Sequence, residues 1–521
     1  MIGTDKNNLI QPAADTNRMR LAWYSATVFI SSAVLLVLEI TAGRLIAPYV
    51  GVTIYSWTSI IGVILAGLSL GNWLGGRLAD RGAGETATGV VLALSAATSL
   101  LSLYALVLIA PLIQDSQLDL LSSSFVYVLS MFFLPSVLLG IPTPLLTTLA
   151  LNLDEHTGRI VGRMNALAAL GSICGTFLTG FVLIQYMGSR LIILLSASLL
   201  LLLALPFLRG ATKRLSFTVI AVVIATGGLT YQQQGFANPC DRESSYFCLR
   251  VVDASDQVPF GTARAMVLDH LVHGINHESE PGMLVAPYVH LMQELADRHF
   301  ATQPQRELNY FFAGGGSYTQ PRALGSLNPG ARVTVAEVDP MVTELARQRM
   351  FLSVDDIEVI HGDARTTLYR QKNRRYDVIV TDAFHDIAIP YHLVTQEYIE
   401  LARSRLQPDG LFTTNVVDAF PNPRMVKSLL KTLQQSFAHV DIWLDEIPQQ
   451  AQRMTFVIAA SDKAFDEDIL YSQRGFERRW FRINEPLLRS GDALADLPVF
   501  SDDFVPVERM ISDLLLTPQG L

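Results

Sequence analysis

Seven long apolar segments fill the first half of the 521-residue chain and constrain its fold more than any other feature. A helix needs about 20 consecutive apolar residues to cross a hydrocarbon core of roughly 30 Å. Runs of this kind occur near residues 22–42, 55–79, 88–111, 123–149, 165–185, 191–208 and 215–231. The sequence therefore predicts a membrane domain of about seven helices over residues 22–232, preceded by a tail at 1–21.

Charged residues are distributed unevenly along the chain. Residues 21–232 contain 16 of them, whereas residues 233–521 contain 66, of which 27 are basic and 39 are acidic. The second half is therefore predicted to be an ordinary water-exposed domain. It is expected to contain a β-region and linker helix at 233–300 and a Rossmann-like part at 301–521. Its excess of acidic residues argues against nucleic-acid binding and mildly favours a cationic ligand.

Lys and Arg near the ends of the spans predict the orientation of the membrane domain, because cytoplasmic loops collect these residues. One side has ten of them and the other side only Arg44 and Arg190. The ten are Lys6, Arg18, Arg20, Arg77, Arg81, Arg159, Arg163, Arg209, Lys213 and Arg214. The N-terminus is therefore expected in the cytoplasm. Seven spans then put the C-terminal domain on the periplasmic side of the inner (plasma) membrane.

Two cysteines bear on the same question. Cys240 and Cys248 flank a short turn just after the last span. An oxidising compartment would permit a disulfide between them, whereas two unrelated thiols are the alternative. A disulfide here would agree with an exported C-terminal domain.

Small residues recur at helical spacing inside two of the spans. The second span places Gly67, Gly71 and Gly75 four residues apart, and the fifth repeats the spacing with Gly171 and Gly175. Glycines at this spacing form one face of a helix and allow close approach of another helix. A tight helical bundle is the simplest interpretation.

The chain after the last span changes to a pattern of strands and helices. A β-hairpin region is expected over 245–276 and a helix near 283–299. Five apolar runs then alternate with helical segments, namely NYFFAGGG, RVTVAEVDP, IEVIHGDA, YDVIVTDAF and GLFTTNVV. This alternation predicts a doubly wound parallel sheet, in which ligands bind beyond the carboxyl ends of the strands.

Distinctive residues follow four of these strands. Gly314, Gly315 and Gly316 allow a ligand to approach the backbone closely, and Glu337 stands where a carboxylate accepts hydrogen bonds from ribose hydroxyls. Asp363 with Ala364 suits an adenine, and Asp382 ends the fourth strand, at the centre of the cleft. Each alone could be a helix cap or a solvated carboxylate, but together they predict an adenosine-containing ligand. No phosphate loop and no zinc-type spacing occurs, so no metal is expected.

These motifs resemble the spermidine synthase (polyamine aminopropyltransferase) family over residues 245–460. The resemblance rests on the LDH hairpin segment, GGG, EVDP, GDA, YDVIVTDAF and YHLVTQEYIELARSRLQPDGLF in the family's order. The whole chain is similar to bacterial membrane proteins in which a multi-span domain is fused to a synthase-like domain. The membrane half contributes LEITAGRLIAP and GLSLGNWLGGRLADR to this resemblance.

The resemblance implies a transferase that uses decarboxylated S-adenosylmethionine to make a polyamine. Gly314–Gly316 would line the sulfonium and the tail of the donor, Glu337 would hold the ribose, and Asp363 with Ala364 the adenine. Asp382 would take the proton of the attacking amine, because an amine is a nucleophile only when it is neutral. The acceptor would lie among His273, Tyr288, His385, Asp386 and Tyr391.

Several positions depart from the family pattern. Ser317 stands where the family usually has Asp, and His385 replaces the second acid of the catalytic loop, with Asp386 one place later. His273 replaces a glutamine, and His290 replaces an acidic partner of Tyr288. Because a serine would not repel the carboxylate of intact S-adenosylmethionine, Ser317 weakens the case for the decarboxylated donor. The histidines near this cleft have two interpretations. They are either ordinary polar loop residues, or a relay or acceptor-binding group that is active near neutral pH.

Three functions remain open at this stage. The first is aminopropyl transfer to an amine. The second is use of intact S-adenosylmethionine for methyl or amino-carboxypropyl transfer. The third is transport or sensing of a nucleoside or polyamine, which Glu39 and the glycine-lined spans keep open. The expected partners are a small amine and the lipid bilayer, and a homodimer is left open.

Overall fold

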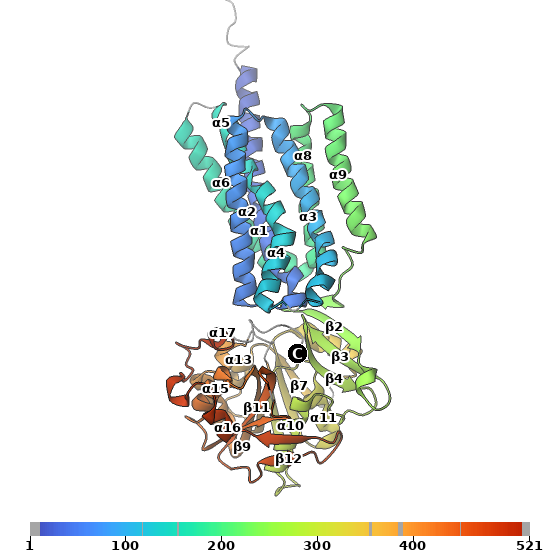
Figure 1. The fold of residues 1–521 in the computed structure, drawn as a ribbon, viewed down its shortest axis with the longest axis vertical. Helices are drawn as coiled ribbons and strands as arrows, with labels where there is room; N and C mark the ends of the chain where they lie inside the picture. The colour runs from blue at the N-terminus through green and yellow to red at the C-terminus, as the bar shows by residue number, and fades with distance from the viewer. Residues whose placement is uncertain are drawn as a thin grey trace, which may run out of the picture. The chain divides into compact units, whose positions relative to one another are not determined.

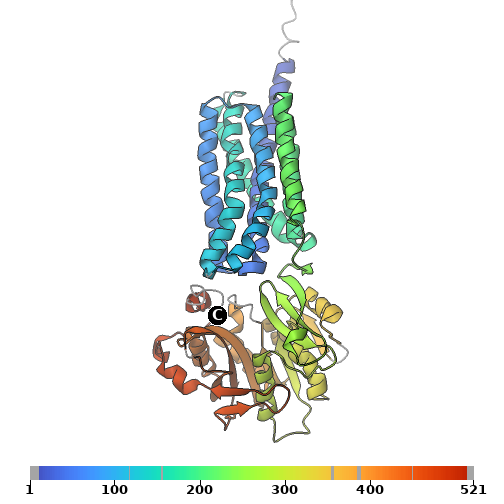
Figure 2. The ribbon, with the colours of Figure 1, turned by 45° about the vertical axis from the view of Figure 1, so that its right-hand side comes forward.

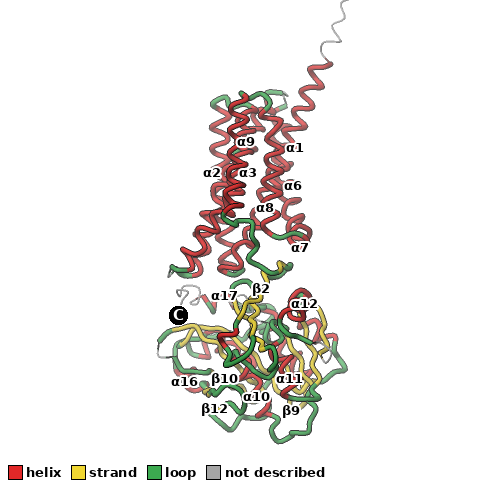
Figure 3. Tube along the Cα trace, turned by 90° about the vertical axis from the view of Figure 1, so that its right-hand side faces the viewer, coloured by secondary structure: helices red, strands yellow, loops and turns green. Residues whose placement is uncertain are grey.

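The computed structural model describes residues 11–116, 118–153, 156–353, 357–383, 389–448 and 450–512. The chain forms two compact units, Met1–Pro239 and Cys240–Leu521. Figure 3 shows that the first unit is helical and that the strands of the described residues belong to the second.

The first unit is a bundle of long apolar helices, which run side by side in Figures 1 and 2. Seven stretches of its described residues are long and apolar enough to cross a membrane, as the sequence predicts. Two of these stretches consist of two consecutive helices each. In one of them α5 follows α4, and in the other a π-helical turn at Thr179–Leu183 joins α6 to α7. The helices are α1 (Gln11–Val50), α2 (Ile54–Asp80), α3 (Glu85–Gln114), α4 (Leu120–Gly140), α5 (Pro142–Leu151), α6 (Thr157–Leu178), α7 (Ile184–Tyr186), α8 (Ser189–Leu208) and α9 (Lys213–Gln232).

The glycine stripes are helix contacts, as expected. A Cβ atom added to Gly71 of α2 would lie 2.1 Å from the carbonyl oxygen of Val137 in α4. A Cβ atom on Gly171 of α6 would lie 2.1 Å from the carbonyl oxygen of Phe29 in α1. The two helix pairs therefore pack backbone against backbone, and a larger side chain at either glycine would force them apart.

The second unit begins with a small antiparallel sheet in the order β1-β2-β3-β4. Its strands are β1 (Arg242–Glu243), β2 (Cys248–Asp253), β3 (Ala263–Leu268) and β4 (Leu271–His277), which matches the predicted hairpin region. Cys240 and Cys248 form a disulfide with their Cα atoms 5.3 Å apart. The β3–β4 turn contains Asp269, whose carboxylate accepts the Cys248 N–H at 2.8 Å and so fixes the turn to β2.

A nine-stranded mixed sheet forms the centre of the second unit, in the order β12-β13-β10-β11-β9-β8-β5-β6-β7. The five predicted strands pair in parallel, which confirms the Rossmann-like class. They are β5 (Asn309–Ala313), β6 (Arg332–Glu337), β7 (Ile357–His361), β8 (Tyr376–Thr381) and β9 (Leu406–Phe420). Since β5 lies between β6 and β8, the strand order reverses there, and this is where a doubly wound sheet forms its ligand cleft.

The other four strands are antiparallel and differ from the fully parallel sheet expected from the sequence. β11 pairs with β9 and β10, and β13 pairs with β10 and β12. Their bounds are β10 (His439–Leu444), β11 (Gln452–Ser461), β12 (Ile469–Tyr471) and β13 (Arg479–Arg482). Antiparallel neighbours need only short connections, so this half lacks the strand–helix alternation that identifies the parallel half.

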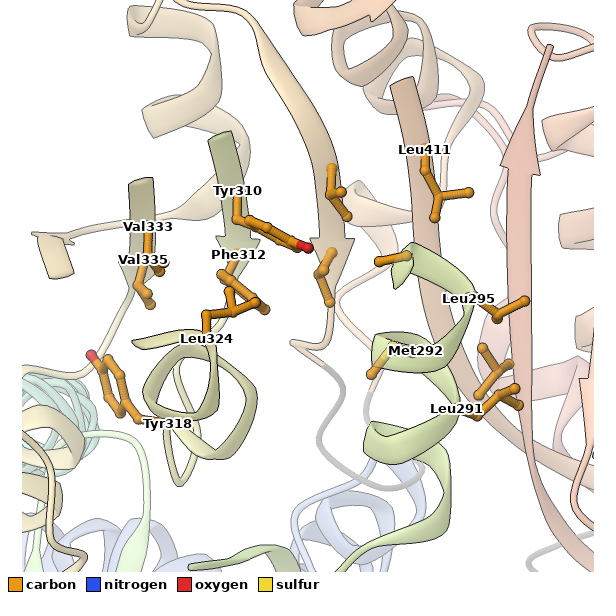
Figure 4. Packing of buried hydrophobic residues seen from close by; sticks show 14 of the residues in the cluster. Leu291, Met292, Leu295, Tyr310, Phe312, Tyr318, Leu324, Val333, Val335 and Leu411 are labelled. Carbon is orange, nitrogen blue, oxygen red and sulfur yellow. The ribbon is translucent and has the colours of Figure 1, made fainter. Parts of the chain in front are cut away.

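Helices cover both faces of the large sheet. Tyr310 and Phe312 of β5 pack with Leu295 of α10 and Leu324 of α11, and Phe311 between them is equally buried (Figure 4). Because neighbouring side chains of a strand point to opposite faces, β5 is buried on both. The helices of the second unit are α10 (Pro287–His299), α11 (Thr319–Leu327), α12 (Pro340–Arg349), α13 (Ala364–Arg370), α14 (Gln396–Arg405), α15 (Arg424–Leu433), α16 (Asn484–Arg489) and α17 (Val507–Met510).

Candidate active site

A pocket of about 240 Å³ opens at the carboxyl ends of β5, β6, β7 and β8. The fold brings together here most of the residues that the sequence singled out after these strands. Those that line it are His273, Gly314, Gly316, Glu337, Asp363, Ala364 and Asp382. The pocket therefore lies where the strand order reverses, the usual ligand position in such a sheet.

The glycine turn after β5 forms one wall of the pocket. Gly314 has φ +98° and Gly316 has φ +49°, which side chains rarely tolerate. A Cβ atom on Gly314 would also lie 2.5 Å from the carbonyl oxygen of Asp382. The ring of Tyr318 fills the space beside Gly315, where a Cβ atom would meet it at 2.6 Å. Because Tyr318 covers the turn beside Gly315, only the other side of the turn presents backbone that a ligand can contact.

Glu337, at the end of β6, holds this turn in place. Its Oε2 atom accepts the N–H of Gly315 at 2.8 Å and that of Gly316 at 3.3 Å, and its Oε1 atom accepts the N–H of Asp339 at 2.9 Å. Desolvation raises the pKa of Glu337, and these hydrogen bonds to its carboxylate oppose the rise. The carboxylate therefore shapes the pocket wall and also faces the cavity.

Asp363 occupies the N-cap of α13 and lines the pocket beside Ala364. One carboxylate oxygen accepts the N–H of Thr366 at 2.7 Å, and the other lies 2.7 Å from Nε2 of His392. Desolvation works to raise the pKa of Asp363, but the hydrogen bonds from Thr366 and His392 outweigh it and lower the pKa. Asp363 is therefore ionised at neutral pH, and both of its carboxylate oxygens are hydrogen-bond acceptors.

Asp382 follows β8 at the centre of the cleft. The side chains of Asn415 in β9 and Tyr288 in α10 hydrogen-bond to its carboxylate. Burial raises the pKa of Asp382 to about 6, while these two hydrogen bonds oppose the rise. Burial and the neighbouring Asp382 raise the pKa of Tyr288 far above its ordinary value. Tyr288 therefore stays protonated, and its O–H donates a hydrogen bond to the carboxylate. A carboxyl group with a pKa near neutrality is suited to proton transfer.

A second cavity of about 430 Å³ has Tyr288 in its wall. Its walls include Asp445 and Glu446 after β10, Arg453 of β11 and Trp480 of β13. Tyr288 lines this cavity and bonds to Asp382, which lines the first. The Tyr288–Asp382 pair is therefore common to both cavities.

Ser317, which the sequence places beside the donor, is not among the residues that line this pocket. Its side chain is 2% exposed, and its hydroxyl donates to the carbonyl oxygen of His273 at 3.2 Å and pairs with Thr319 Oγ1 at 2.7 Å. The left-handed backbone at Gly316 turns the serine toward β4 instead of toward the cavity.

The remaining predicted residues are placed less centrally or lie outside the described part. Tyr391 is 62% exposed and follows Pro390, which does line the pocket. His385 and Asp386 lie outside the described residues. His290 is buried against Trp480, with ring centroids 5.1 Å apart, and burial lowers its pKa to about 4. His290 is thus neutral near pH 7 and would not supply a negative charge beside Tyr288.

Sequence reasoning missed four contributors to the site. Tyr246 and Phe247, in the turn between β1 and β2, line the pocket together with Leu393. Asn415 reaches Asp382 from β9, where it was a lone amide within an apolar run. That amide was the only local signal, since nothing in the sequence marks the β1–β2 turn as part of a pocket. Among the described residues, no group of three or more His, Cys, Asp and Glu side chains could hold a metal ion.

Comparison with known proteins agrees with this geometry. Residues 309–469 match the family model described as the spermine/spermidine synthase domain. The C-terminal unit therefore contains a spermine/spermidine synthase domain, as the resemblance of the motifs implied.

Curated relatives carry polyamine aminopropyltransferase names. The polyamine aminopropyltransferase of Vibrio vulnificus is 34% identical over 132 residues, which are 25% of this chain and 42% of the relative. A probable polyamine aminopropyl transferase of Bifidobacterium longum is 24% identical over 336 residues, which are 58% of this chain and 70% of the relative. The chain thus spans less than half of the first relative and about two thirds of the second.

Solved structures also show similarity to this chain. A probable spermidine synthase from Corynebacterium glutamicum has 20% identity and a TM-score of 0.41, with 50% of this chain and 96% of that chain covered. Spermidine synthase from Thermotoga maritima has 18% identity and a TM-score of 0.31, with 41% of this chain and 70% of that chain covered.

Proposed function

We propose that the C-terminal unit is an aminopropyltransferase that uses decarboxylated S-adenosylmethionine and an amine. The charge of the donor pocket carries this proposal. Its described lining residues include three carboxylates, Glu337, Asp363 and Asp382, and no Lys or Arg. The decarboxylated donor has only positive charges, on its sulfonium and its ammonium. The intact donor also has a carboxylate, which would find no basic partner among these residues.

Each pocket residue has a role in this proposal. The backbone turn at Gly314–Gly316 would accommodate the sulfonium and the propyl chain, because a side chain there would fill the space. Glu337 would accept hydrogen bonds from the ribose hydroxyls while it keeps the turn in shape. Asp363 would accept a hydrogen bond from the adenine amino group, and Ala364 would contact the face of the ring.

Asp382 would act as the general base. The neutral amine attacks the propyl carbon beside sulfur, a new C–N bond forms and the C–S bond breaks. The electron pair of the broken bond stays on sulfur, so methylthioadenosine leaves as a neutral thioether. The proton lost by the amine passes to the Asp382 carboxylate. Tyr288 and Asn415 would hold this carboxylate toward the amine.

The acceptor would reach Asp382 from the second cavity, which has Tyr288 in its wall. Asp445 and Glu446 line this cavity, and burial raises the pKa of Asp445. A diamine with one neutral and one protonated amine would present the neutral nitrogen to Asp382 and the ammonium to these acids. This assignment gives an alkyl diamine as the acceptor class.

The experiment that tests the proposal compares two donors with the full-length protein in detergent. Decarboxylated and intact S-adenosylmethionine are each supplied with putrescine, and the nucleoside products are separated by chromatography. We expect methylthioadenosine from the decarboxylated donor in an amount equal to the aminopropylated amine. Turnover of intact donor alone, with S-adenosylhomocysteine as product, would overturn the proposal.

The pKa of Asp382 predicts a pH dependence of the reaction. Because burial raises this pKa to about 6, the carboxylate is the main form above pH 6 and the carboxylic acid is the main form below it. The kcat/KM value should therefore fall about tenfold per pH unit below pH 6. Asp382→Asn should lose this inflection, whereas an inflection that survives in the variant would assign it to another group.

We also propose that the C-terminal unit lies outside the cytoplasm. Three observations support this side. The number of apolar helices is odd among the described residues, basic residues at the helix ends divide ten to two, and Cys240 is bonded to Cys248. Disulfides persist in oxidising compartments and are rare in the cytoplasm.

Thiol labelling tests this topology in cells with an intact cytoplasmic membrane. Thr302, exposed after α10, is changed to Cys, and Gly158, exposed at the start of α6, is changed to Cys as the matched control. Both variants also carry Cys174→Ser, which removes the free thiol. A membrane-impermeant maleimide should label Thr302→Cys and leave Gly158→Cys unlabelled. The reverse result, with Cys240 and Cys248 recovered as thiols, would place the unit in the cytoplasm.

A further inference from the structure

The helical unit contains a cavity of about 710 Å³ that belongs to neither half of the proposed active site. Three helices form it near one end of the bundle. α1 contributes Arg20 and Trp23, α3 contributes Glu85 in its first turn, and the end of α8 contributes Phe207 and Arg209. The cavity lies entirely within the first unit.

The charges of this cavity favour an anionic ligand. Arg20 is 3.8 Å from Glu85, and the Tyr24 hydroxyl also donates to that carboxylate. Arg209 is exposed at the C-cap of α8, and its guanidinium has no ion pair among the described residues. One of the two guanidinium charges is therefore left uncompensated, and the cavity has a net charge of about one positive unit at neutral pH.

The other walls of the cavity are apolar and aromatic. Met19, Ala22, Ala26 and Pro206 line it. Phe207 packs against Trp23 and Tyr24, with ring centroids 6.2 Å and 6.1 Å apart. The indole N–H of Trp23 is buried and has no hydrogen-bond partner among the described residues. Charged groups beside an apolar wall fit an amphiphile better than a free ion.

The helix boundaries locate this cavity at headgroup depth. The apolar run of α1 begins directly after Arg20, that of α3 begins after Glu85, and that of α8 ends before Arg209. Polar residues at the ends of such runs, with Trp and Tyr beside them, mark the boundary between headgroups and acyl chains. Basic pockets between membrane helices bind lipid headgroups at this level.

We propose that this cavity is a binding site for an anionic phospholipid. Arg209 would bind the phosphate, with Arg20 as a second ligand. The first part of an acyl chain would lie along Phe207 and Ala26. Guanidinium groups suit phosphate because their N–H groups form paired, charge-assisted hydrogen bonds.

Native mass spectrometry of the full-length protein in detergent tests the site with phosphatidylglycerol as the probe. Arg209→Gln should retain phosphatidylglycerol about tenfold more weakly than the wild type, which corresponds to about 1.4 kcal/mol. Arg163→Gln is the matched control, because Arg163 is exposed on α6 and does not line the cavity. An equal loss in both variants, or no loss in Arg209→Gln, would overturn the proposal.

Two further arms identify the kind of ligand. Phosphatidylcholine should be retained less than phosphatidylglycerol by the wild type, since it has no net charge, and equal retention would refute the anionic preference. Inorganic phosphate should not displace the lipid at equal concentration, and effective displacement would make the site one for a free anion.

Glu85→Gln should strengthen lipid binding, which is the opposite of the effect expected for Arg209→Gln. The amide removes the negative charge that competes for Arg20, while its oxygen can still accept from Tyr24. Retention of phosphatidylglycerol should therefore increase several-fold. A decrease in Glu85→Gln would contradict the assignment of Arg20 as a phosphate ligand.

Discussion

Replacing Asp382 by Asn should lower kcat/KM for aminopropyl transfer by roughly 10²–10⁴-fold, the usual contribution of a general base. The amide keeps the shape of the side chain and a hydrogen-bond acceptor for Tyr288, but it cannot take the proton of the amine. Initial rates of methylthioadenosine release measure the effect. Glu358→Gln is the matched control, because this carboxylate lies on β7, pairs with Arg374 and does not line the pocket.

The stability of Asp382→Asn separates a lost base from a misfolded protein. The folded pKa of Asp382 is about 6, above the ordinary value of 3.8. The folded state therefore carries a buried charge above pH 6, and this penalty disappears below about pH 4. Removing the charge should raise the free energy of unfolding at pH 8 by on the order of 3 kcal/mol. A variant that is inactive and also less stable than the wild type would contradict the assigned role.

Replacing Glu337 by Ala should weaken the binding of methylthioadenosine by about 1–3 kcal/mol, or roughly 5- to 150-fold. Two effects act together. The ribose hydroxyls lose their acceptor, and the N–H groups of Gly315 and Gly316 lose the carboxylate that fixes the turn. Isothermal titration calorimetry with the full-length protein measures the affinity.

Two comparisons make this second result specific. Glu344→Ala, on the exposed side of α12, should bind methylthioadenosine as the wild type does. Glu337→Gln should lie between the wild type and Glu337→Ala, because the amide oxygen can still accept from one side of the turn. Unchanged affinity in Glu337→Ala would exclude Glu337 from the nucleoside site.

The parallel half of the sheet could be predicted because its strands are short apolar runs that end in polar residues. NYFFAGGG and YDVIVTDAF became β5 and β8, with Gly314 and Asp382 just beyond their ends. Strands that are buried on both faces read as continuous apolar runs, which makes them easy to recognise. The antiparallel strands β10 and β11 follow each other without an intervening helix, so the strand–helix alternation that identifies the parallel half did not assign them.

Site residues could be predicted where their position at the end of a strand determines that they face the pocket. Glu337 and Asp363 reach the pocket for this reason, since parallel strands end at one edge of the sheet. Ser317 lies one residue beyond a left-handed glycine, and its direction depends on a backbone angle that the sequence does not show. The contacts of Asp382 with Tyr288 and Asn415 join three distant segments, and only tertiary packing creates them.

The fate of the propyl chain is the most direct test of the function. Decarboxylated S-adenosylmethionine that is isotopically labelled in its propyl carbons is incubated with putrescine and the full-length protein, and both products are weighed by mass spectrometry. Aminopropyl transfer predicts that the label appears in the amine and is absent from the methylthioadenosine. Asp382→Asn should give the same products at a far lower rate. Label that stays with the nucleoside, or an amine that gains only a methyl group, would contradict the proposed reaction.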